Sequence, residues 1–166
     1  MADSASRRHM PLQRVARALL RSSPTACADI QGMPRYPGLR GTACFYPSNG
    51  GTLAQVEVEG LPASDTGVFA IHIHEGGQCT GNEQDPFANT GGHYNPENVP
   101  HPRHAGDMPP LFSNNGFAYF SFFTDRFSPA DVIGRTVVIH SNPDDFHTQP
   151  SGASGMKIAC GVIRRV

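Results

Sequence analysis

The chain has 166 residues, 38% of them hydrophobic and 16% charged, which suits one globular domain with a single core. Its 18 glycines and 15 prolines make it turn-rich, but it has neither a collagen-like repeat nor the high charge of a disordered protein. The formal net charge of −1 and the lack of a basic patch argue against nucleic-acid binding, and no apolar run approaches the roughly 20 residues that span a bilayer.

The N-terminal residues 1–25 differ in composition from the rest of the chain. Leu12, Val15 and Leu19 are spaced as on one face of a helix, with arginines between them. An arginine also interrupts the apolar run, so a secretory signal is not recognised. We therefore predict a leader or short amphipathic helix within residues 1–25 and one domain over residues 26–166.

From residue 26 onward, runs of β-branched and aromatic residues alternate with turn residues. The predicted strands span residues 26–32, 41–46, 52–60, 67–74, 117–124, 135–140 and 157–163. The lack of an internal helix, repeat or βαβ alternation favours an all-β sandwich or Greek-key barrel. Residues 75–115 remain as a long irregular stretch, which in a compact domain indicates function, a metal or a disulfide.

Histidine is the unusual residue of this chain, with eight copies against one lysine. His72 and His74 are two apart in a predicted strand, so both project from one face about 6.7 Å apart along the backbone. Two such imidazoles can share a metal, but a pair alone is also compatible with surface histidines. His140 ends a later strand, where an isolated histidine is usually structural or solvated.

The irregular stretch holds a second set of candidate ligands. His93, His101, His104 and Asp107 bring three imidazoles and one carboxylate, which is a complete donor set for tetrahedral zinc. Neighbouring prolines stiffen this segment and lower the entropy cost of gathering ligands in a loop. Spacing alone therefore predicts a histidine-rich β protein with two metals.

Several separated blocks resemble the copper,zinc superoxide dismutases of the bacterial type, with a short zinc loop, over about residues 26–163. In the family's order they are Ala70–His74 (AIHIH), Gly91–Pro96 (GGHYNP), His104–Asp107 (HAGD), Gly134–His140 (GRTVVIH) and Gly155–Ile163 (GMKIACGVI). The resemblance implies an eight-stranded Greek-key β-barrel or sandwich with long metal-binding loops.

The same resemblance assigns ligands by position. It implies copper at His72, His74, His93 and His140, and zinc at His93, His101, His104 and Asp107. His93 would bridge both metals. Asp144 matches the family's carboxylate that joins a copper ligand to a zinc ligand through their free ring nitrogens, although by sequence alone it reads as an exposed turn residue.

The four cysteines fall into two pairs. Cys79 and Cys160 match the family's intrachain disulfide. Cys27 and Cys44 are additional, and alternation in their predicted strands directs both thiols to the outer face of adjacent strands. Pairing and free thiols are both compatible with that placement. A disulfide is typical of an oxidising compartment, so the compartment stays open between the cytoplasm, from the missing signal, and an extracytoplasmic location.

The activity that the resemblance implies is superoxide dismutation. One superoxide reduces Cu(II) and leaves as oxygen, and a second takes the electron from Cu(I) and leaves as peroxide, with His93 releasing copper and carrying a proton. Lys157 stands where the family has an arginine, and it keeps the charge without the two-donor fork. The loop between Asp145 and Gly155 is also short for the family's charged channel loop, and it has His147 and Gln149 where charged residues that guide the anion would be expected. We therefore expect a slower enzyme whose rate depends less on salt.

Two other functions remain compatible with the same ligands. One is a non-catalytic copper-binding or copper-delivery module, because fold and ligands do not guarantee turnover. The other is a zinc-stabilised structural domain with a vestigial copper site, which is disfavoured because no copper ligand is missing. The expected partners are superoxide as a small-molecule substrate and, left open by the sequence, a second copy of the chain in a homodimer.

Overall fold

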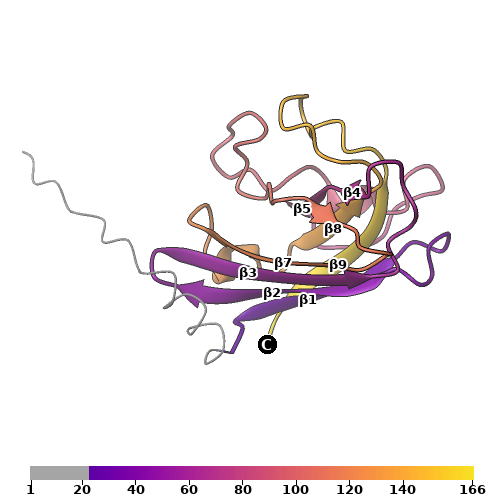
Figure 1. Cartoon of the computed structure of the whole chain (residues 1–166). Helices are drawn as coiled ribbons and strands as arrows, with labels where there is room; N and C mark the ends of the chain where they lie inside the picture. The colour runs from indigo at the N-terminus through magenta and orange to yellow at the C-terminus, as the bar shows by residue number, and fades with distance from the viewer. Residues whose placement is uncertain (1–22) are drawn as a thin grey trace, which may run out of the picture.

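The computed structural model describes residues 23–166, which fold into nine antiparallel strands joined by long loops (Figure 1). The strands are β1 (Ala26–Gly32), β2 (Arg40–Ser48), β3 (Gly51–Glu59), β4 (Val68–Phe69), β5 (Ile71–His74), β6 (Leu111–Phe112), β7 (Ala118–Thr124), β8 (Thr136–His140) and β9 (Lys157–Arg165). Two short 3-10 helices, η1 (Ala88–Thr90) and η2 (Pro129–Val132), lie in the loops. No helix of residues 23–166 is long and apolar enough to cross a membrane. The amphipathic helix expected near the N-terminus lies outside the described residues.

Seven of the strands form one curled sheet in the order β5-β8-β9-β1-β2-β3-β7, and β4 pairs with β6. The curl carries β5 and β8 over β1, β2 and β3 (Figure 1). Buried side chains from both halves belong to one apolar cluster: Ile30, Phe45, Val56 from one side and Ile71, Ile73, Val137, Ile139 from the other. The all-β prediction is confirmed, with nine strands in this part of the chain instead of eight.

In the part of the sheet formed by β1, β2 and β3, burial follows the alternation of the sequence. In β3, Ala54, Val56 and Val58 face the core while Glu57 and Glu59 face solvent. In β5 and β8 every residue is buried, because the barrel core covers one face and the loops cover the other. The histidines of β5 are therefore on a covered outer face of the barrel, not on an exposed surface.

The prediction of a single strand over residues 67–74 is wrong in one respect, because the structure divides this segment into two strands at Ala70. β4 pairs with β6, within the stretch expected to be irregular, whereas β5 pairs with β8. Between them the Ala70 N–H donates to the carbonyl of Asn142, and the Ala70 carbonyl accepts from the His140 N–H. The chain thus changes its pairing partner at this residue without leaving an extended path.

Both cysteine pairs form disulfides. Cys79–Cys160 ties the loop after β5 to β9, and Cys27–Cys44 joins directly opposed residues of β1 and β2. The pairing of Cys27 with Cys44, which the sequence left open, follows from a register that places their Cα atoms 4.2 Å apart.

Candidate metal centre

Four histidines meet on the outer face of the β5–β8 pair. We call His72, His74, His93 and His140 the four-histidine group; one ring nitrogen from each lies within 4.8 Å of the others, and all four residues are buried. His72 and His74 come from β5 and His140 from the end of β8. A bridge between His74 and His93 brings the loop histidine to the strand.

Backbone contacts fix this loop against β5. The Tyr94 N–H donates to the Ile73 carbonyl at 2.8 Å, and the Gly106 carbonyl accepts from the Ile73 N–H at 2.8 Å. A side chain at Gly106 would collide with the Ile73 carbonyl oxygen, so only glycine permits this close approach. The segment that carries His93 therefore lies beside β5 like an added strand.

The second group consists of His93, His101, His104 and Asp107, which we call the three-histidine group. Asp107 is at its centre: Oδ1 lies 2.8 Å from His93 Nδ1 and 3.4 Å from His104 Nδ1, and Oδ2 lies 3.1 Å from His101 Nδ1. Since His93 belongs to both groups, its two ring nitrogens serve different neighbours.

The ring nitrogens show whether these groups fit metals. His72 Nδ1, His93 Nε2 and His101 Nδ1 are buried and form no hydrogen bond within residues 23–166; the short distance from His101 Nδ1 to Asp107 Oδ2 is an ion-pair contact without hydrogen-bond geometry. Burying such an atom unsatisfied is costly, and a metal at each group would satisfy all three. Four imidazoles suit copper, and three imidazoles with a carboxylate suit zinc, so the residues present fit both ions.

Asp144 joins the two groups. Its Oδ2 lies 2.7 Å from His72 Nε2 and its Oδ1 lies 2.9 Å from His101 Nε2. Burial would raise the pKa of Asp144, but the hydrogen bonds from His72, the Phe146 N–H and His101 outweigh it and lower the pKa to about 2. A side chain at Gly152, whose φ is +68°, would displace this carboxylate.

Two further residues hold the loop of the three-histidine group: Gln149, which the sequence marked only as a channel-loop position, and Arg126, which it did not single out. The Gln149 amide donates to the His101 carbonyl at 2.7 Å and accepts from the His101 N–H at 3.0 Å. Arg126 Nη1 donates to the carbonyls of Pro102 and His104, both at 3.1 Å. The Gln149 side chain thus holds the backbone of His101, a candidate ligand, and is not directed at an incoming anion. No spacing pattern marks either residue.

Lys157 lies beside the four-histidine group. It is the Cα partner of His140 across β8 and β9, although its ammonium contacts Asp85 and the Phe87 carbonyl. The exposed His147 bonds only to near neighbours in its own loop, Asp145 and Gln149. The candidate residues other than His147 therefore converge on one side of the barrel.

Burial keeps His72, His74 and His140 of the four-histidine group neutral. It lowers the pKa of His72 to about 4, despite the hydrogen bond to Asp144. Burial, together with the charges of neighbouring histidines, also holds the pKa values of His74 and His140 well below the ordinary range. Near neutral pH their ring nitrogens therefore have lone pairs free for a metal.

The metal-free protein should lose stability as the pH falls from about 6.5 to about 4. In that range the unfolded chain protonates His72 whereas the folded chain does not, so the unfolded state binds more protons and acid favours it. Each such histidine contributes about 1.4 kcal/mol per pH unit. Below pH 3.8, Asp144 adds a second loss that continues to about pH 2, because its carboxylate stays ionised longer in the folded state.

Urea unfolding of chelator-treated protein at several pH values measures this loss. The His147→Ala variant should give the same profile, because that imidazole is exposed and outside both groups. A free energy of unfolding that is constant between pH 7 and pH 4.5 would contradict the expectation.

Replacing Asp144 with asparagine should weaken metal binding by about 10- to 100-fold. The amide has one oxygen to accept with, so it can orient His72 or His101 but not both. Chelator competition gives the dissociation constants. Asp145→Asn is the matched control, since that carboxylate bonds only within its own turn, to His147 and Thr148. Equal effects of the two substitutions would disprove the orienting role.

Comparisons with known proteins agree with this arrangement. The family model for copper/zinc superoxide dismutase matches residues 39–163. A superoxide dismutase [Cu-Zn] of Deinococcus radiodurans is 35% identical, covering 87% of this chain and 91% of that protein. Superoxide dismutase [Cu-Zn] 2 of Aquifex aeolicus is 34% identical, covering 75% and 78%. The solved Cu/Zn superoxide dismutase from Brucella abortus superposes with a TM-score of 0.69 at 27% identity, covering 82% of this chain and 98% of that one.

A curled β-sheet with two groups of possible metal ligands that share one imidazole is typical of a β-barrel protein with a two-metal centre. The chain belongs to the copper/zinc superoxide dismutase family, as its sequence motifs predicted.

Proposed function

We propose that this protein is a superoxide dismutase that uses copper at the four-histidine group and zinc at the three-histidine group. The observation that carries the proposal is the shared residue: His93 presents Nδ1 to Asp107 and leaves Nε2 buried and unpartnered on the other side. When bound, copper supplies the one-electron exchange that converts two superoxide anions to oxygen and hydrogen peroxide.

The protein's own residues orient the ligands and carry the proton. The Nδ1–H of His74 donates to the Gly91 carbonyl, 2.9 Å away, so Nε2 is the nitrogen left for a metal. His93 Nε2 can hold a proton whenever it is not a ligand, while Nδ1 keeps the ring in place. Lys157 provides the positive charge beside the four-histidine group that attracts a small anion.

The test is to load the purified protein with copper and zinc, measure both metals, and follow superoxide decay directly. We expect about one ion of each per chain, in line with the two groups, and decay far faster than in the chelator-treated protein. Full loading without accelerated decay would overturn the proposal and leave a copper-binding or copper-delivery module.

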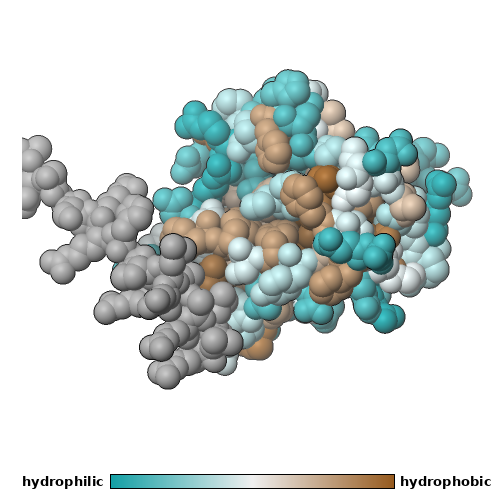
Figure 2. Space-filling view, in the orientation of Figure 1, coloured by the Kyte–Doolittle hydropathy of each residue, from teal (hydrophilic) through white to brown (hydrophobic). Residues whose placement is uncertain are grey.

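A homodimer is a further proposal about partners. Phe112, Tyr119 and Phe123 are exposed aromatic residues, a feature of association surfaces. Figure 2 shows apolar side chains gathered near the middle of the displayed face, in the region of β3 and β7. Sedimentation should give twice the 17.8 kDa chain mass, and a single-chain mass would refute a dimer.

The net charge of −1 supports the proposal that nucleic acid is not a partner.

A further inference from the structure

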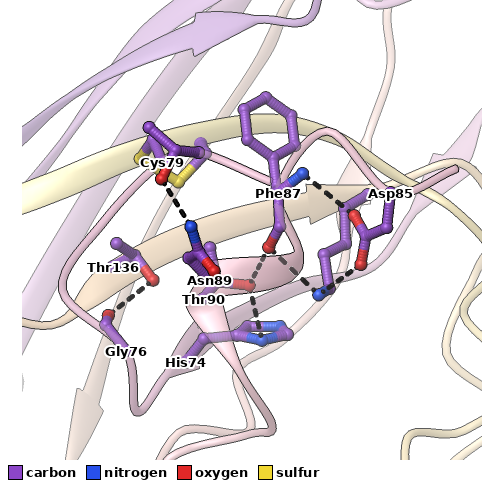
Figure 3. The surroundings of a disulfide bond; sticks show 11 residues. His74, Gly76, Cys79, Asp85, Phe87, Asn89, Thr90 and Thr136 are labelled. Atoms are coloured by element: carbon purple, nitrogen blue, oxygen red, sulfur yellow. Dashed lines mark hydrogen bonds and ion pairs between the residues drawn. A yellow bond between two sulfur atoms is a disulfide. The ribbon is translucent and has the colours of Figure 1, made fainter. Parts of the chain in front are cut away.

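Lys157, the proposed active-site cation, is engaged in an ion pair with Asp85, which Figure 3 shows next to Phe87. Its Nζ lies 2.9 Å from Asp85 Oδ2 and 3.2 Å from the Phe87 carbonyl oxygen. The lysine side chain is 16% exposed and that of Asp85 39% exposed, so the pair is partly shielded from water. Within the described part of the chain, these contacts use two of the three ammonium donors and leave one for a ligand.

Asp85 is held in place by its own loop. Its Oδ1 accepts the Phe87 N–H at 2.9 Å, which leaves Oδ2 directed at the ammonium. Its backbone carbonyl accepts the N–H groups of Asn82 and Ala88. The same loop begins at the Cys79–Cys160 disulfide, which joins it to β9 three residues from Lys157. The carboxylate is therefore preorganised and is not a mobile surface partner.

The ion pair is also connected to the four-histidine group. The Phe87 carbonyl accepts from Lys157 and from Thr90 Oγ1, the latter at 2.8 Å. Thr90 Oγ1 lies 3.5 Å from Nδ1 of His74 (Figure 3). On the other side, Lys157 is the strand partner of His140. The loop that positions the ammonium therefore also contacts His74 through Thr90, and the lysine itself is paired with His140.

We propose that Asp85 is a positioning residue that fixes the Lys157 ammonium and offsets its charge, and so weakens the attraction of the copper site for small anions. This inference rests on the proposed function. Opposite charges 2.9 Å apart partly cancel at longer distances, so an approaching anion meets a smaller net charge than a free lysine would present. The arrangement supplies a physical cause for the weak salt dependence that the sequence led us to expect.

The test compares Asp85→Asn with wild type in anion binding to the Cu(II) protein, using azide titrated at low ionic strength and followed by its charge-transfer absorption. Asparagine keeps an oxygen for the Phe87 N–H and turns an NH2 group toward Lys157, which removes both the charge and the acceptor of the ion pair, so we expect azide to bind roughly threefold or more tightly. Glu83→Gln is the matched control, because Glu83 is exposed in the same loop and should leave the affinity near that of wild type. In a Lys157→Gln background, Asp85→Asn should have little further effect.

A second measurement does not need copper. Lys157 is the only lysine in the sequence, so acetylation by acetic anhydride can be followed at this residue by peptide mass spectrometry. In wild type the amine is held by Asp85 and is largely shielded from solvent, so loss of that contact should leave it freer to meet the reagent, and labelling should be faster in Asp85→Asn than in Glu83→Gln or wild type. Unchanged azide binding in Asp85→Asn would overturn the inference even in an active enzyme. If the protein bound no copper, the proposed function would fail, and unchanged labelling would then overturn the Asp85 role separately.

Discussion

Replacing His140 with alanine is expected to reduce copper-dependent superoxide decay by at least roughly 100-fold. Loss of a residue that only orients a metal ligand already costs 10- to 100-fold in metal affinity or activity, and His140 would be a ligand itself. Its Nε2 lies 3.2 Å from His74 Nε2 at the centre of the four-histidine group, and the residue is buried. Metal analysis combined with direct measurement of superoxide decay checks this expectation.

The same variant separates the two proposed sites. His140 is absent from the three-histidine group, so zinc binding should be retained while copper is lost. His147→Ala is the matched control, because it removes an imidazole that is 79% exposed and outside both groups. If the His140→Ala protein accelerated superoxide decay as much as the His147→Ala protein, the copper assignment of the four-histidine group would be wrong.

The fold could be predicted where alternation reflects burial. In β3 the charged residues Glu57 and Glu59 alternate with core residues, and the sequence therefore marks the strand. The division at Ala70 could not be predicted, because β4 and β5 follow one another in a continuous run of strand-forming residues and nothing in that run marks the change of pairing partner. Partners come from tertiary structure, which local propensity does not contain.

The candidate site divides in a similar way. Metal ligands are restricted to a few residue types, so His93 and Asp107 stand out even in an irregular loop. The residues that hold them do not. Asp85 is 72 positions from Lys157, and Gln149 is 48 positions from His101, and their hydrogen bonds require only a polar group that many residue types could supply. A sequence shows the ligands of a metal centre more readily than the contacts that position them.

Removal of the Cys79–Cys160 disulfide should lower the free energy of unfolding by about 4.5 kcal/mol. In the chain-entropy model the loss grows with the length of the loop that the bond closes, here a sequence separation of 81. Alanine at both positions avoids burying an unpaired polar atom beside Phe87 and Val138. Urea unfolding of the metal-free variant measures the change without a contribution from metal binding.

The Cys27–Cys44 disulfide provides the internal comparison, since its sequence separation is only 17 and its removal should cost about 3 kcal/mol. The two losses also differ in place. Cys27 and Cys44 join neighbouring strands that are already paired, whereas Cys79 anchors the loop that carries Asp85 and Phe87 against Lys157. We therefore expect acetylation of Lys157 to become faster only when Cys79–Cys160 is removed. A larger stability loss for the Cys27–Cys44 variant, or equal labelling in both, would contradict this role for the longer disulfide loop.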